Sequence, residues 1–153
     1  KKEIKDSKKL KKIEREKLSK YIKKNSIWAI GKASNKEIDK INILQASLLA
    51  MKRAINKLKK KPSYILVDGN KLPDLKNFKM KAIVKGDQKI PVISAASIIA
   101  KVSRDKFITS LAKKNSGYYW HLNFGYGTKQ HLGAIKKLGV SKHHRKTFAP
   151  IRK

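Results

Sequence analysis

The 153-residue chain carries 40 Lys and Arg against 10 Asp and Glu, a formal net charge of +30, and 40% of its residues are hydrophobic. This composition excludes a disordered basic tail and favours one domain with a core and a polyanionic partner, either nucleic acid or an anionic membrane surface. Cysteine is absent, which excludes disulfides and thiolate metal sites and fits a cytoplasmic location. No apolar run reaches the roughly 18 residues of a membrane span.

The first half of the chain predicts mainly helices. Apolar residues at helical spacing indicate an amphipathic helix over residues 8–24, and Ser26–Ala33, with its apolar run Ile27–Ile30, favours a short strand. Ser34 and Glu37 have the spacing of a capping box, which predicts that a helix begins there. The apolar face of residues 43–58 predicts a long helix.

The second half begins with short strands. Tyr64–Val67 predicts a buried strand, residues 71–80 a loop, and Ala82–Val84 a second strand. A helix follows over residues 92–114, and the aromatic and glycine-rich residues 115–127 predict a loop.

The C-terminal part predicts a last helix that Thr128 caps and that ends near Gly139, followed by an irregular basic tail. No repeat or linker divides the chain. We therefore expect one α/β domain over residues 1–153, with a basic C-terminal helix and tail at about 128–153.

Asp68 is the first candidate for chemistry. It ends an apolar strand and precedes Gly69, so it is expected to point inward. Carboxylates are scarce in this cationic chain, and one at an inward-pointing position indicates a bound cation. A strand end is a common place for a ligand-facing residue in an α/β sheet. The alternative is that Asp68 serves the turn that follows it.

Asp105 is the second candidate. The helical pattern puts it on the apolar face that also carries Ile98 and Val102, where a divalent metal would compensate its charge. The alternative is an ion pair with Lys101 or Arg104, and Lys101 has the favourable spacing of four residues.

Tyr126 lies between Gly125 and Gly127, which let the backbone approach a ligand and leave the ring exposed for stacking on a nucleotide. The alternative is a tyrosine that packs within the loop. The four histidines show no regular ligand spacing, so most are interpreted as surface or phosphate-contacting residues: His121, His131, His143 and His144.

Several segments, taken in chain order, resemble ribonuclease HII, and the match covers nearly the whole chain. The most specific segment is Ala95–Asp105, which reads Ala-Ala-Ser-Ile-Ile-Ala-Lys-Val-Ser-Arg-Asp. The others are Asp6–Leu10, Glu37–Asp39, Asn42–Ala46, Ala50–Ala54, Leu66–Asn70, Val84–Asp87, Gly125–Thr128, His144–Arg145 and Phe148–Pro150.

The resemblance implies a ribonuclease H-like fold, with a mixed sheet flanked by helices. It implies an endonuclease that cuts RNA in RNA–DNA hybrids and cuts 5′ of ribonucleotides embedded in duplex DNA, using Mg²⁺ or Mn²⁺. Asp68 and Asp105 correspond to two of the four metal-binding, catalytic carboxylates of the family. A monomer is expected.

The resemblance also implies contacts with the nucleic acid. Tyr126 corresponds to the tyrosine that stacks beneath the sugar at the ribonucleotide–DNA junction, and Lys8 to a phosphate-contacting lysine. Lys101 and Arg145, which lie in matching segments, are expected to bind nucleic acid as well.

One family motif, Asp-Glu-x-Gly-Arg-Gly, does not occur in these 153 residues. In the family it precedes the segment that matches Asp6–Leu10 and supplies the other two carboxylates and the backbone that reads the 2′-hydroxyl. We therefore expect this chain by itself to lack the first strands of the fold and to be inactive in cleavage. The competing hypotheses are a non-catalytic basic RNA-binding protein and a degenerate nuclease that only binds nucleic acid.

Overall fold

The computed structural model describes residues 10–149 and 151–152. The chain divides into two compact units, residues 1–100 and 101–153, and the boundary falls inside helix α4 (Pro91–Lys114). The expectation of a single domain over residues 1–153 stays a prediction.

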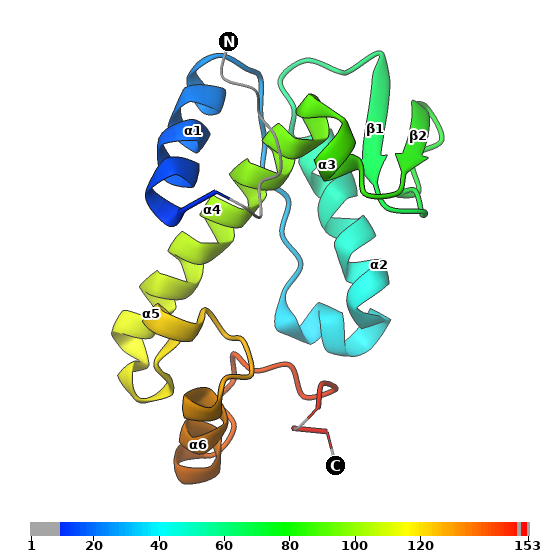
Figure 1. Ribbon diagram of the computed structural model, residues 1–153. Helices are drawn as coiled ribbons and strands as arrows, with labels where there is room; N and C mark the ends of the chain where they lie inside the picture. Colours follow the sequence, from blue (N-terminus) through cyan, green and yellow to red (C-terminus); the bar gives the residue numbers. More distant parts are fainter. Residues whose placement is uncertain (1–9, 150, 153) are drawn as a thin grey trace. The chain divides into compact units, whose positions relative to one another are not determined.

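The helical core of the first unit joins α1 (Lys12–Lys24) to the first part of α4 (Figure 1). Ile22 of α1 packs with Ile98 and Ile99 of α4, and all three are at most 7% exposed. The helix predicted over residues 8–24 is therefore confirmed from Lys12 to Lys24, with Leu18 and Ile22 packed in this core and Ile13 and Tyr21 exposed.

Helix α2 (Asn35–Asn56) begins as the sequence predicts. The Ser34 hydroxyl accepts a hydrogen bond from the Glu37 amide, and the Glu37 carboxylate accepts one from the Ser34 amide at 2.8 Å. The helix has a kink at Asn42, whose φ is 65°. The Asn42 side chain accepts a hydrogen bond from the Gln45 amide, so it caps the longer half that the sequence predicts over residues 43–58.

An ion pair ties the two halves of α2 together. Arg53 Nη2 lies 2.6 Å from Glu37 Oε1, and Arg53 Nη1 also donates to the Lys32 carbonyl at 2.8 Å. The Arg53 hydrogen bond, followed by that of the Ser34 amide, lowers the pKa of Glu37 to about 2. The pair therefore keeps Glu37 charged in the folded protein down to acidic pH.

The sheet of the described residues has two parallel strands, β1 (Tyr64–Asp68) and β2 (Lys79–Ile83). Tyr64 pairs with Lys79 and Asp68 with Ile83. The α/β class is confirmed, but these residues form a parallel pair rather than the expected mixed sheet.

Strand β2 begins in the segment predicted as a loop and ends before Val84. Its exposed lysines alternate with Met80 and half-buried apolar residues, so the sequence shows only a weak apolar signal, and pairing with β1 defines the strand.

The predicted strand at Ser26–Ala33 is wrong. Residues 27–34 run without regular structure, and Ile27 is 58% exposed. A strand needs a hydrogen-bonded neighbour, and this segment instead passes close to α2. A Cβ added to Gly31 would collide with the Ala50 carbonyl oxygen and lie 2.6 Å from the Ala54 amide nitrogen.

The second unit contains the rest of α4, the 3₁₀ turn η1 (Ser116–Tyr118), α5 (Trp120–Asn123) and α6 (Lys129–Leu138). Thr128 caps α6 by accepting a hydrogen bond from the His131 amide at 3.2 Å, and the helix ends before Gly139, as predicted. The predicted loop 115–127 holds two short helical turns, η1 and α5.

Buried aromatic and histidine rings form the core beside α6. Tyr118 stacks on Trp120 with ring centroids 5.1 Å apart, and His131 stacks on His144 at 5.4 Å. His131 and His144 are 4% and 7% exposed, so their assignment to the surface is wrong. The spacing of the histidines does not predict this burial, because the two rings come together only when the tail folds back on α6.

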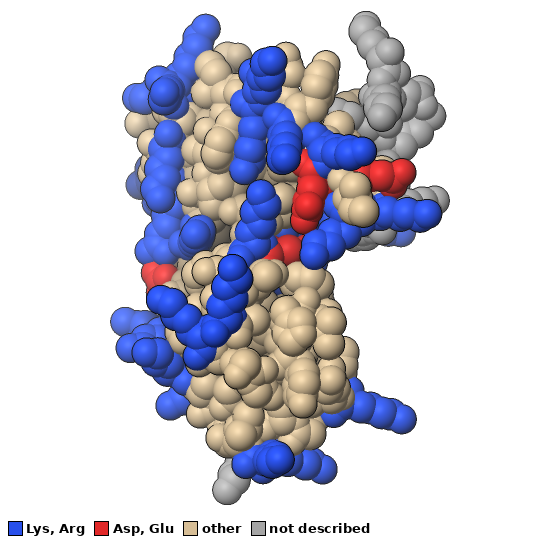
Figure 2. Space-filling view, turned by 90° about the vertical axis from the view of Figure 1, so that its left-hand side faces the viewer, with Lys and Arg blue, Asp and Glu red and all other residues tan. Residues whose placement is uncertain are grey.

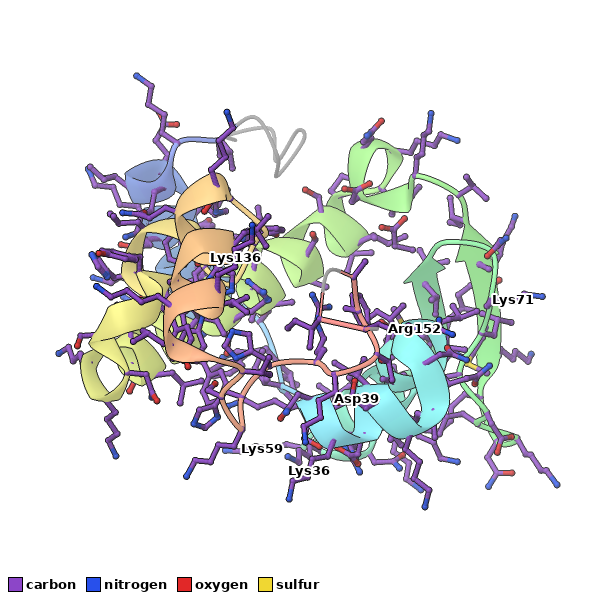
Figure 3. All side chains as sticks on the ribbon, turned by 90° about the horizontal axis from the view of Figure 1, so that it is seen from below. Lys36, Asp39, Lys59, Lys71, Lys136 and Arg152 are labelled. Atoms are coloured by element: carbon purple, nitrogen blue, oxygen red, sulfur yellow. The ribbon has the colours of Figure 1, made fainter. Side chains whose placement is uncertain are left out.

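Most of the described lysine side chains lie on the surface. Figure 2 shows Lys and Arg side chains spread over the face in view, with few Asp and Glu among them. Lys36, Lys59 and Lys71, which are labelled in Figure 3, are exposed. None of the helices in the described part of the chain is long and apolar enough to cross a membrane.

The contact at Gly31 predicts a stability effect. Gly31→Ala should lower the free energy of unfolding by roughly 1–3 kcal/mol, because the added methyl overpacks the approach to α2. Gly133→Ala adds the same methyl inside α6, where it meets no atom within 4 Å, and should raise stability by up to about 1 kcal/mol. Urea unfolding measures both, and equal effects of the two changes would contradict the packing argument.

The buried His144 predicts a pH effect on the second unit. Burial, followed by the electrostatic interaction with His131, lowers the pKa of His144. Because the unfolded pKa is about 6.5, the neutral form stabilises the fold, and stability should fall as the pH drops below that value.

Trp120 fluorescence in a Trp28→Phe background would follow this unit during thermal unfolding between pH 7.5 and 5. His144→Gln should flatten the pH dependence, whereas His121→Gln, at an exposed site, should keep it. A wild-type slope as flat as that of His144→Gln would rule out this source of pH dependence.

Candidate functional site

Asp68 is exposed at the end of β1, so the inward orientation predicted for it is wrong. Successive side chains of a strand point to opposite faces, and Ile65 and Val67 take the buried face. Placing Val67 in the core therefore turns Asp68 toward solvent.

The Asp68 carboxylate is held by a backbone group beyond β2. Its Oδ1 accepts a hydrogen bond of 2.8 Å from the amide of Gly86, the first residue of α3 (Gly86–Lys89). Gly86 packs closely there, since an added Cβ would lie 2.6 Å from Ile93 Cδ1. Among the hydrogen bonds of the described residues, Asp68 Oδ2 takes part in none, so this oxygen is available to a ligand.

Asp105 is buried on α4, as predicted, and is 8% exposed. Lys101 Nζ lies 2.8 Å from its Oδ1, and Arg104 Nη1 lies 3.8 Å from the same atom. The ion pair considered as an alternative is therefore present. It compensates the buried charge, and a carboxylate that is held in place in this way is also a suitable metal ligand.

Tyr126 is 58% exposed, so the structure does not support a tyrosine packed inside the loop. Lys101 Nζ and Arg104 Cζ each lie 5.4 Å from the centroid of its ring. Both distances are within the range of cation–π attraction. The second unit thus brings Asp105, Lys101 and Tyr126 together, with Lys101 in contact with both of the others.

Asn123 organises the loop that presents Tyr126, and sequence reasoning missed it. Its side chain accepts a hydrogen bond from the Gly125 amide at 2.8 Å and donates one to the Tyr118 carbonyl at 2.9 Å. Its own carbonyl accepts from the Tyr126 amide at 2.9 Å. The signal in the sequence was the asparagine two residues before Gly125, because Asn often bonds to the backbone two residues on.

The other two predicted nucleic-acid contacts are Arg145 and Lys8. Arg145 lies over the ring of Phe148, with Cζ 3.7 Å from the centroid, in the C-terminal tail. Lys8 lies outside the described residues.

The donors fit a hard divalent cation in kind, because Mg²⁺ and Mn²⁺ prefer carboxylate oxygens. Asp68 belongs to the first unit and Asp105 to the second, and each carboxylate has its own support. No group of three or more His, Cys, Asp or Glu side chains gathers within residues 10–149 and 151–152. Each aspartate would therefore supply part of a coordination shell.

Two solved structures resemble the chain. The ribonuclease H2 of Pyrococcus horikoshii OT3 matches with a TM-score of 0.71 and 30% identity, over 97% of this chain and 78% of that one. The structure of the PCNA:RNase HII complex from Archaeoglobus fulgidus matches with a TM-score of 0.66 at 24% identity, over 98% of this chain and 80% of that one, which bears on the fold alone. The fold is therefore the ribonuclease H-like fold.

Sequence comparison gives the family. The chain is 72% identical to the ribonuclease HII of Pelagibacter ubique over 151 residues, which are 99% of this chain and 81% of the relative. It is 47% identical to that of Neisseria meningitidis serogroup B, over 96% of this chain and 76% of the relative. The family model for ribonuclease HII matches residues 1–151, and the chain belongs to the ribonuclease HII family.

Proposed function

We propose that this ribonuclease HII chain hydrolyses the RNA strand of RNA–DNA hybrids and cuts on the 5′ side of ribonucleotides embedded in duplex DNA. The observation that carries the proposal is the family match over residues 1–151, which includes the segments around Asp68, Asp105 and Tyr126. The proposal includes dependence on Mg²⁺ or Mn²⁺.

In this proposal Asp68 and Asp105 are metal ligands. A bound divalent cation supplies polarisation of the attacking water and stabilisation of charge on the phosphate. The hydrogen bond from the Gly86 amide fixes the direction of the Asp68 carboxylate, and the contact with Lys101 holds the Asp105 carboxylate in place. Both supports reduce the free energy that must be spent on ordering the ligands when a cation binds.

Tyr126 is the proposed stacking platform for the sugar and base at the ribonucleotide. More than half of its surface is exposed, and two cations lie near its ring, which draw the phosphate backbone toward it. Lys101 and Arg145 are proposed phosphate contacts in the same unit.

The net charge of +30 supplies affinity without sequence preference. Each phosphate that a lysine or arginine neutralises releases counterions, so binding should weaken steeply as salt rises. A non-catalytic RNA-binding protein would share this salt dependence, but it would cleave no substrate and its binding would be indifferent to Mg²⁺.

Asp68→Asn tests the metal role of the strand end. We expect cleavage of a hybrid in Mg²⁺ to fall by more than about 100-fold, because the loss of a ligand should exceed the 10–100-fold effect typical of groups that only support one. Hybrid binding should be largely retained, since a neutral amide remains at that position.

The assay uses the 153-residue chain joined to a segment with the Asp-Glu-x-Gly-Arg-Gly motif, because that motif carries two of the family's carboxylates. The matched control is Asp74→Asn, the same change at a carboxylate that is exposed and 3.4 Å from Lys52. Normal turnover by Asp68→Asn would refute the metal role, and an equal loss in Asp74→Asn would point to a general charge effect.

Tyr126→Ala tests the stacking role in the same joined chain. Stacking of a base on an aromatic ring contributes roughly 1–3 kcal/mol, so cleavage at a single embedded ribonucleotide should fall by roughly 5- to 150-fold. Tyr21→Ala removes another exposed tyrosine, on α1, and should leave the rate unchanged. An unchanged rate in Tyr126→Ala would refute the stacking role of Tyr126.

A further inference from the structure

The guanidinium group of Arg104 contacts three parts of the second unit. Its Nη2 donates a hydrogen bond of 3.1 Å to the carbonyl of Phe124, and its Cζ lies 5.4 Å from the ring centroid of Tyr126. Its Nη1 lies 3.8 Å from Asp105 Oδ1. One side chain thus connects α4 with the backbone before Tyr126 and with the Tyr126 ring.

The backbone that Arg104 holds is in an unfavourable conformation. Phe124 has a φ of 50° and Gly125 a φ of 79°, so two consecutive residues lie in the left-handed region. Such a conformation in a non-glycine residue persists only when its surroundings enforce it. The Asn123 bonds act from within the loop, whereas the Arg104 bond comes from another element, α4.

Arginine suits this position better than lysine. A planar guanidinium can donate hydrogen bonds along its edge while its charge lies near an aromatic ring, and its geometry is fixed by the plane. A lysine keeps the charge, but its ammonium group lacks this fixed planar geometry. Lys101 already places an ammonium group near the same ring, so the charge alone does not explain the arginine.

We propose that Arg104 is a positioning residue for Tyr126: its hydrogen bond to the Phe124 carbonyl and its contact with the ring hold the loop so that Tyr126 is ready to stack on nucleic acid. The proposal rests on the stacking role of Tyr126 proposed above. An ordered ring loses less conformational entropy on binding than a mobile one, so the effect of Arg104 on affinity acts through Tyr126.

The first experiment measures the loop itself in the 153-residue chain and needs no substrate. Amide hydrogen exchange is followed at Gly125 and Tyr126 in the wild type, in Arg104→Lys and in Lys106→Gln. Arg104→Lys should speed exchange at both amides by about fivefold, since it removes the guanidinium contact and keeps the charge. Lys106→Gln removes a charge from an exposed neighbour on α4 and should leave exchange unchanged.

The second experiment is a double-mutant cycle on the affinity for an RNA–DNA hybrid. Arg104→Lys should weaken binding about fivefold in the wild-type background and have no effect in the Tyr126→Ala background, because residues that act as a unit are not additive. If Arg104 only contacted phosphate, Arg104→Lys would retain most of the affinity, because lysine keeps the charge. The small loss of affinity would then be the same in the wild-type and Tyr126→Ala backgrounds.

Unchanged exchange in Arg104→Lys, or equal losses of affinity in the two backgrounds, would overturn the positioning role. Faster exchange together with a Tyr126→Ala variant that binds like the wild type would instead contradict the stacking role of Tyr126 and, with it, the link from Arg104 to binding. The two failures are therefore distinguishable.

Discussion

The ion pair between Lys101 and Asp105 is the interaction on which the rest of the second unit's candidate site depends. Asp105 is 8% exposed, and a buried carboxylate without a partner would cost several kcal/mol. Lys101 pairs with it at 2.8 Å from one helical turn away. The same ammonium group lies 5.4 Å from the Tyr126 ring centroid, so the pair that neutralises Asp105 also places a cation beside the exposed tyrosine. In a chain with a net charge of +30, the buried Asp105 carboxylate thus holds one particular lysine beside the exposed tyrosine.

The loop before Tyr126 shows why an aromatic residue in an exposed position needs support. Tyr119 and Phe124 both have a positive φ, which is costly for residues with a side chain. Asn123 compensates by bonding to Tyr118 and Gly125, and the rings of Tyr118 and Trp120 anchor the base of the loop in the core. Ligand-binding side chains often lie on loops that a rigid, packed scaffold holds in position.

Sequence patterns predicted the elements whose signals are local. The capping box at Ser34, the Thr128 cap and the apolar face that ends in Asp105 depend on residues three to seven positions apart, and all three are confirmed. The resemblance to ribonuclease HII, carried by ordered motifs, is confirmed over residues 1–151.

The features that depend on distant residues were not predictable in the same way. The start of β2 is set by pairing with β1, and the burial of His131 and His144 depends on the tail meeting α6. Ile27–Ile30 has strand-like composition, but no strand pairs with it in the described residues, so tertiary context overrides propensity. Asn123 acts through its position in a loop whose backbone conformation the sequence does not specify.

The hydrogen bonds of Asp68 argue against its role in the following turn and are compatible with the proposed metal role. An aspartate that serves its own turn would bond to the amides of the next residues, but the Gly69 amide donates to the Ile83 carbonyl at 3.0 Å and is used by the sheet. Asp68 instead accepts its hydrogen bond from Gly86, eighteen residues later. That bond fixes one carboxylate oxygen and leaves the group open to solvent at the end of a strand, which is the combination of order and access that a metal ligand requires.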